Sequence, residues 1–194
     1  MNARIFLAQF AVATAVLCAA ACLFRAADLY PATGDDFPRQ ALAATWAQQP
    51  FLAPPDFYWL PLPFWLFGSW HWLAPAALGP LWYAPLSIVL LALTAALLAL
   101  AARALCGGQA AARALSGWLA LLFFLSIPFI LRLSVGIMAE LPLLICLAGF
   151  LAALVRLAGP PSAPSRRLFA LAVAALAALT MTRYEMWPIA ALGW

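Results

Sequence analysis

Residues 81–102 read LWYAPLSIVLLALTAALLALAA, a run of 22 residues without a charged side chain. A helix needs about 20 apolar residues to cross the hydrocarbon core of a bilayer, so this run predicts a transmembrane helix. Four further apolar stretches without an internal charge lie at residues 5–23, 114–131, 141–155 and 168–182. The sequence therefore predicts an all-α, polytopic membrane protein with about five transmembrane helices in a single domain, residues 1–194.

The composition agrees with this class, because 68% of the residues are hydrophobic and only 8% are charged. All ten basic residues are arginines, and several of them flank the apolar stretches, where they fix membrane orientation. Nucleic acid is therefore not an expected partner. The cysteines have no metal-site or disulfide spacing and are interpreted as small packing residues; they are Cys18, Cys22, Cys106 and Cys146.

The orientation depends on whether residues 57–78, which are rich in proline and tryptophan, cross the membrane. Proline and tryptophan at this density favour the interface, and short arginine-rich loops favour the cytoplasm. If residues 57–78 do not cross, six arginines lie inside and four outside, whereas crossing would move five of the six outward. The preferred topology has a cytoplasmic N-terminus and places every acidic residue outside: Asp28, Asp35, Asp36, Asp56, Glu140 and Glu185.

The first span has an alternative interpretation as a cleaved secretory signal, because Arg4 precedes an apolar stretch and small residues with Cys22 follow it. In both cases the next loop, residues 24–80, lies outside. Six of the nine tryptophans lie in this loop or just after it, which predicts a layer that follows the membrane surface. Residues 38–49 predict a short juxtamembrane helix within it.

Two groups of acidic residues are candidates for chemistry. Asp35 and Asp36 precede the short helix and together offer a general base and a ligand for a divalent cation, with a helix cap as the alternative. Glu140 lies between two spans at the outer boundary, where a carboxylate is costly unless it is solvated or paired. The structural alternative for Glu140 is a salt bridge to Arg132 at the same boundary.

The end of the last span adds a cation and an anion. Arg183 could neutralise a phosphate and Glu185 could bind a sugar hydroxyl, although both residues could equally be interfacial anchors. His71 stands among tryptophans without a second metal ligand nearby, and is interpreted as an interfacial polar residue.

The order of several short motifs resembles the GT-C superfamily of polyprenyl-phosphate-sugar-dependent membrane glycosyltransferases, which includes protein mannosyltransferases and the aminoarabinose transferase of lipid A. A first span is followed by an outer acidic pair opening a helix, then by a proline- and aromatic-rich stretch and a basic inner loop. A later outer acidic residue before proline and a Thr-Arg element complete the series. The matching segments are GDDFPR (34–39), PPDFYWLPLPFW (54–65), ARALCG (102–107), AELP (139–142) and TR (182–183).

The resemblance implies transfer of a sugar from a polyprenyl-phosphate donor to an acceptor hydroxyl on a glycan, lipid or protein by one inverting displacement. Asp35, or less plausibly Asp36, would be the general base, and Glu140 would orient the acceptor or help to hold a divalent metal ion. Many relatives carry a lysine or histidine near the proline-rich stretch that can contact phosphate, whereas this chain has no lysine and only His71. An arginine would therefore neutralise the leaving phosphate. The arginine candidates are Arg39, Arg132 and Arg183.

The resemblance also implies a longer protein, because relatives commonly have more spans and an outer domain, so the chain is expected to be an N-terminal part. The absence of lysine and the abundance of alanine suggest a GC-rich bacterial genome, hence a bacterial inner membrane. A transporter or flippase component and a non-catalytic membrane scaffold remain as alternatives. A transporter predicts charges in the middle of spans, and a scaffold predicts that Asp35, Glu140 and Arg183 do not converge.

Overall fold

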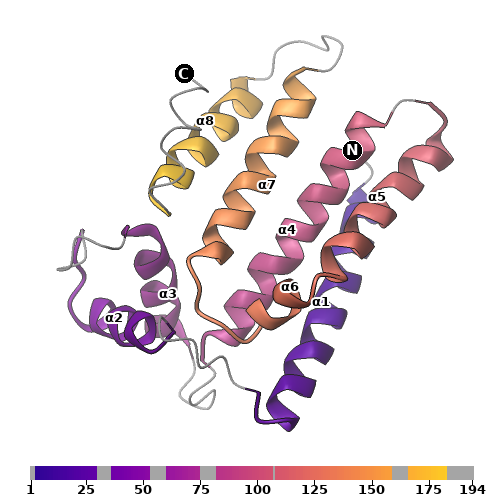
Figure 1. Cartoon of the computed structure of the whole chain (residues 1–194). Coiled ribbons are helices and arrows are strands. Elements are labelled where there is room, and N and C mark those ends of the chain that lie inside the picture. The colour runs from indigo at the N-terminus through magenta and orange to yellow at the C-terminus, as the bar shows by residue number, and fades with distance from the viewer. Residues whose placement is uncertain are drawn as a thin grey trace.

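The computed structural model describes residues 3–29, 36–52, 60–74, 82–106, 108–158 and 166–182. Throughout these ranges the regular secondary structure is helical, with no strand (Figure 1). The helices are α1 (Ala3–Ala26), α2 (Asp36–Gln48), α3 (Leu62–Leu73), α4 (Ala84–Leu105), α5 (Ala110–Leu125), α6 (Pro128–Leu133), α7 (Glu140–Leu157) and α8 (Arg166–Thr180). The predicted all-α class is therefore confirmed for the described part of the chain.

Helix α4 is the centre of a bundle. It packs against α1, α5 and α7, and α8 packs against the far side of α7 (Figure 1). Along α4, Ala92, Ala95 and Ala99 are fully buried, and such small side chains let neighbouring helices approach closely in a membrane bundle. In the most apolar 18-residue stretch of α4, 61% of the residues are buried, against 17% in the corresponding stretch of α1. The outer helices therefore carry most of the exposed apolar surface.

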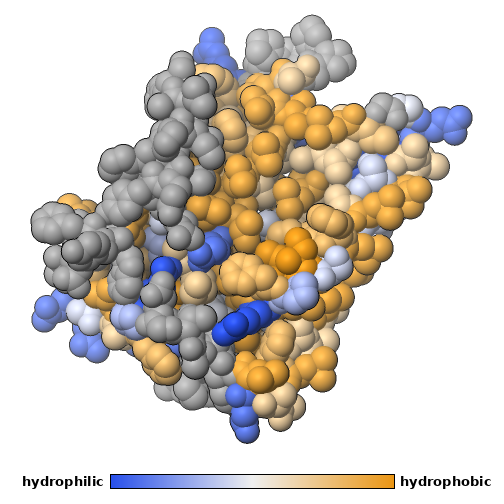
Figure 2. Space-filling model, in the orientation of Figure 1, coloured by the Kyte–Doolittle hydropathy of each residue, from blue (hydrophilic) through white to orange (hydrophobic). Residues whose placement is uncertain are grey.

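Three helices, α1, α4 and α7, are long and apolar enough to cross a membrane. Their 24, 22 and 18 residues correspond to about 36, 33 and 27 Å, close to the ~30 Å hydrocarbon core of a bilayer. Large apolar side chains such as Leu7, Leu23 and Phe123 point away from the bundle, and apolar residues dominate the face in Figure 2. This surface is suited to lipid contact, as expected of a membrane protein.

The bundle helices run in alternating directions, so the bundle has two distinct ends (Figure 1). One end, called the cap end, is where α1, α5 and α8 finish and where α4 and α7 begin. The shorter helices α2, α3 and α6 also lie at this end. At the opposite, basic end, α1, α5 and α8 begin while α4 and α7 finish.

The two ends differ in charge. Asp28, Asp36 and Glu140 all lie at the cap end, and within the described ranges no acidic residue lies at the basic end. Arg183, Asp35, Asp56 and Glu185 lie outside the described residues. The basic end takes its name from six arginines at helix termini: Arg4, Arg103, Arg113, Arg156, Arg166 and Arg167.

The main departure from the predicted elements concerns residues 114–131, which were expected to form one span. Helix α5 ends at Leu125, Ile127 is extended (φ −78°, ψ 114°), and Pro128 starts the separate helix α6. A residue before proline is driven out of the helical conformation, which explains the break. The predicted helix at 38–49 matches α2 within two residues. Helix α3 has 12 residues, about 18 Å, which is less than the hydrocarbon thickness.

Candidate functional site

Helices α2 and α3 form a closely packed pair at the cap end, and Gly68 of α3 makes this possible. A Cβ atom at position 68 would lie 2.5 Å from Cε3 of Trp46 and 3.1 Å from the carbonyl oxygen of Ala43, both in α2. These distances leave no room for a side chain. The sequence therefore needs glycine at position 68 to seat α3 against the indole ring.

Indole N–H groups then tie the pair together and to the start of α4. Nε1 of Trp46 and Nε1 of Trp65 both donate to the carbonyl oxygen of Phe51, at 2.9 and 3.2 Å. Nε1 of Trp70 donates to the carbonyl oxygen of Trp82 at 2.6 Å. The ring of His71 makes an edge contact with Trp82, with centroids 4.5 Å apart. The tryptophans that predicted an interfacial layer thus also act as hydrogen-bond donors that fix its loops.

Two hydrogen bonds connect the cap end across elements that are distant in sequence. The backbone N–H of Leu62, which opens α3, donates to the carbonyl oxygen of Met181 just after α8, at 3.1 Å. The hydroxyl of Ser87, fully buried in α4, donates to the carbonyl oxygen of Gly136 at 2.8 Å. The second bond anchors the segment between α6 and α7, and so positions the start of α7.

Glu140 is the first residue of α7, beyond that anchored segment. Its side chain is half-buried, and its Oε2 atom is shielded from solvent. Glu140 thus places a carboxyl group at the N-terminus of α7, at the cap end.

The arginine candidates differ sharply in exposure. Arg39 in α2 is buried, with 8% of its surface exposed, whereas Arg132 near the end of α6 is exposed. Burying a guanidinium is costly unless it is paired, and both Arg39 and Glu140 have interaction partners. Arg39 is thus a fixed part of the cap, while Arg132 is accessible to a ligand arriving from outside the bundle.

The cap end brings Arg39, Arg132 and Glu140 to one end of the bundle, together with the backbone of Asp36 at the start of α2. The remaining predicted site residues, Asp35, Arg183 and Glu185, lie outside the described ranges, so their convergence with Glu140 stays a prediction. Among the described residues, no group of three or more His, Cys, Asp or Glu side chains could hold a metal ion. The predicted metal set includes Asp35 and therefore also stays a prediction.

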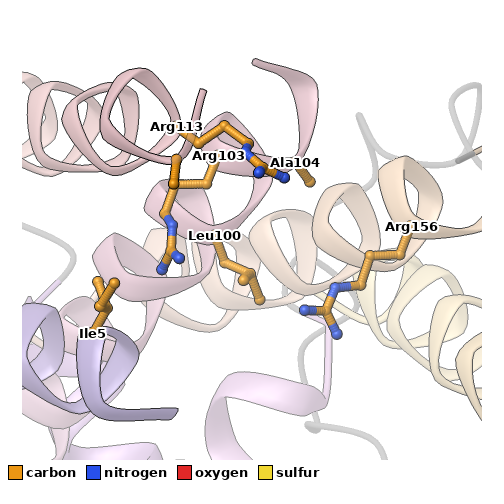
Figure 3. A pocket seen from close by; sticks show the side chains of 7 residues that line it. Ile5, Leu100, Arg103, Ala104, Arg113 and Arg156 are labelled. Carbon is orange, nitrogen blue, oxygen red and sulfur yellow. The ribbon is translucent and has the colours of Figure 1, made fainter. Parts of the chain in front are cut away.

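A second charged region, at the basic end, was not expected to be a site. A cavity of about 380 Å³ lies between α1, α4, α5 and α7, and Arg103, Arg113 and Arg156 contribute to its walls (Figure 3). These arginines flank different apolar stretches and were interpreted only as orientation signals. Their separation in the sequence, over 53 positions from 103 to 156, gives no local motif that would have revealed the cavity.

No family model, curated protein or solved structure matches the chain. The resemblance to the GT-C superfamily therefore rests on the order of the short motifs. The function has to be inferred from the residues at the two ends of the bundle.

Proposed function

We propose that this chain acts as a GT-C-type glycosyltransferase, which uses a polyprenyl-phosphate sugar at the cap end. The observation that carries the proposal is that Glu140, Arg39 and the start of α2 all lie at the tryptophan-rich end of a bundle of apolar helices. A lipid-linked donor explains why a reaction between polar groups would be performed by so apolar a protein. Its isoprenoid tail would lie in the bilayer while its phosphate lies at the level of the cap.

In this proposal α5 and α8 join α1, α4 and α7 as membrane spans, giving five. The 16 residues of α5 cover about 24 Å, so this helix needs the interfacial residues beside it or a locally thinner bilayer. The arginine-rich basic end is cytoplasmic and the cap end lies outside a bacterial inner membrane, as the positive-inside rule favours.

The chemistry assigned to the cap end is a single inverting displacement. Asp35 accepts the proton of the acceptor hydroxyl, whose oxygen attacks the anomeric carbon of the sugar. The bond between that carbon and the phosphate oxygen breaks, and the lipid phosphate leaves as an anion, which an arginine neutralises. Glu140 orients the acceptor. If the reaction uses a divalent metal ion, Asp36 and Glu140 are the residues that would help to hold it.

The test is sugar transfer from a radiolabelled polyprenyl-phosphate sugar, in membranes containing the full-length protein. Asp35→Asn should reduce transfer by at least about 100-fold, because a general base contributes 10²- to 10⁴-fold. Asp28→Asn is the matched control: Asp28 is an exposed carboxylate at the same end, and its replacement should leave transfer unchanged. Full activity of folded Asp35→Asn protein would contradict the proposal.

A lipid flippase or transporter component is the second candidate, and one observation favours it. Gln9 of α1 is fully buried, and its amide atoms have no hydrogen-bond partner among the described residues. A polar side chain inside a membrane bundle is a common feature of transport pathways. Movement of a labelled polyprenyl-phosphate sugar across proteoliposomes, without transfer to an acceptor, would support this function and contradict the enzyme assignment.

A further inference from the structure

The cavity at the basic end has the size and the chemistry of a ligand site. Its volume of about 380 Å³ falls within the 300–1,000 Å³ typical of small-molecule sites. Arg103 comes from α4, Arg113 from α5 and Arg156 from α7, so three separate helices each contribute an arginine to the cavity wall. Figure 3 shows Arg103 and Arg156 reaching into the space beside Leu100, with Arg113 lying across Ala104.

The stem of Arg103 packs between α4 and α5. A Cβ atom on Gly117 of α5 would lie 2.6 Å from both Cγ and Cδ of Arg103, so the arginine stem occupies the space that glycine leaves open. The Nε and Nη1 atoms of Arg103 are shielded from solvent and have no hydrogen-bond partner within the described ranges. A buried donor without an acceptor is destabilising, and a ligand that supplies the acceptor removes that cost.

The charge balance at this end indicates an anion. No acidic residue among those described lies at the basic end to neutralise the three cavity arginines. A guanidinium is always charged, and its planar set of N–H groups matches the oxygens of a phosphate. The cavity therefore has the positive charge and the N–H donors that a phosphate ligand requires.

The position of the cavity along the bundle indicates where the phosphate comes from. Arg103 lies in the last turn of α4, whose 22 residues cover about 33 Å, slightly more than the hydrocarbon core. When α4 crosses the membrane, its last turn lies at the depth of lipid headgroups, and Ile5 and Leu100 form an apolar wall beside Arg103. Basic pockets between transmembrane helices bind anionic lipid headgroups by the same chemistry.

We infer that the Arg103–Arg113–Arg156 cavity binds the phosphate group of an anionic membrane lipid. Inorganic phosphate offers the same chemistry without the acyl chains, so it is the competing source. The inference depends on α4 crossing the membrane and is independent of glycosyl transfer. Loss of lipid binding would leave the proposed catalytic roles at the cap end untouched.

The experiment uses the purified chain in dodecylmaltoside micelles, with phosphatidylglycerol, phosphatidylcholine or inorganic phosphate added. Native mass spectrometry counts the bound lipids, and thermal unfolding measures the stabilisation. Phosphatidylglycerol should bind preferentially as one molecule per chain and raise the unfolding temperature. The double variant Arg103→Gln/Arg156→Gln should bind it about 100-fold more weakly, since each charge-assisted contact accounts for about tenfold.

The matched control is Arg166→Gln/Arg167→Gln, which removes the same charge from exposed positions at the same end. It should retain binding within about threefold. An equal loss in this control would mean that only the general positive charge of the basic end attracts the lipid, and would overturn the site. Equal stabilisation by inorganic phosphate would overturn the lipid assignment. Equal binding of both lipids to the unaltered chain would overturn it without any variant.

Discussion

The cap end and the basic end differ in how many side-chain donors bond to backbone carbonyl oxygens across loops. At the cap end, three indole N–H groups and the Ser87 hydroxyl all donate to backbone carbonyl oxygens. In the basic half, the amide of Gln9 and two nitrogens of Arg103 are shielded and have no partner among the described residues. Native proteins seldom leave buried polar groups unsatisfied. The indole and hydroxyl donors therefore fix the loops of the cap, whereas the shielded nitrogens of Arg103 are the donors that the inferred lipid phosphate would satisfy.

The same contrast appears where helices approach each other most closely. Gly68 at the cap end faces the rigid indole ring of Trp46, whereas Gly117 in the basic half faces the flexible stem of Arg103. Both glycines allow close packing, but only the second neighbour can move aside. The cap should therefore tolerate change less well than the basic end.

The largest expected effect is all-or-none and concerns whether the two ends lie on opposite sides of the membrane. Asp28→Cys should react with a membrane-impermeant maleimide in intact cells, and Arg166→Cys should react only after permeabilisation, because these residues mark the two ends. The background variant carries alanine at Cys18, Cys22, Cys106 and Cys146. Labelling of both positions in intact cells would contradict the proposed orientation, in which the two ends lie on opposite sides of the membrane.

The next largest effect tests the packing contrast. Gly68→Ala should lower the free energy of unfolding by about 1–3 kcal/mol, because its Cβ would overlap the Trp46 ring. Gly117→Ala should cost less, since the Arg103 stem can shift, although the Ala99 carbonyl oxygen lies only 3.0 Å from the added atom. Denaturant titration in micelles, followed by tryptophan fluorescence, provides the measurement.

Gly149→Ala is the control for these two variants. Nothing lies within 4 Å of a Cβ atom at this position in α7, so the change should be neutral or stabilising by up to about 1 kcal/mol through helix propensity. If Gly117→Ala proved more damaging than Gly68→Ala, the basic half would be the more rigid region and the contrast would be reversed.

A smaller effect of opposite sign is expected at Gln9. Gln9→Leu should raise the free energy of unfolding by about 1–2 kcal/mol, because a buried amide without partners is replaced by an apolar group of similar size. Gln9→Ala removes the same amide but leaves a cavity, so it should raise the free energy of unfolding by less than Gln9→Leu does. Destabilisation by Gln9→Leu would mean that the amide is satisfied, and would remove one of the two polar groups that distinguish the basic half.

Sequence reasoning predicted the parts of this fold that depend on local pattern. The apolar runs predicted the long helices, and the proline-bounded segment at 38–49 predicted the ends of α2 to within two residues. The break at Pro128 was missed because apolarity alone continues through residue 131, although the proline itself was the available signal.

The candidate sites show the same limit. Glu140 could be placed at a span boundary from its neighbours, and the structure puts it at the start of α7. The cavity of Arg103, Arg113 and Arg156 could not be predicted, because it depends on how three separate helices are rotated toward one another. Burial of Arg39 likewise follows from how α2 docks and not from its own sequence.

The smallest expected effect on stability concerns Asp28 at the cap end. Among the described residues, Asp28 is the one non-glycine residue with positive φ, at 51°. It ends α1 in a left-handed turn. The N–H of Leu29 donates to the carbonyl oxygen of Phe24 at 2.9 Å, and the N–H of Asp28 donates to the carbonyl oxygen of Arg25 at 3.2 Å. Glycine is the usual residue in this motif, and a carboxylate there also opposes the helix dipole. Asp28→Gly should therefore stabilise the chain by about 0.5–1 kcal/mol in the same titration, and Asp28→Asn should recover only the electrostatic part. A loss of stability in Asp28→Gly would instead show that this carboxylate makes a favourable contact, and that the cap end depends on its charges as well as on its tryptophans.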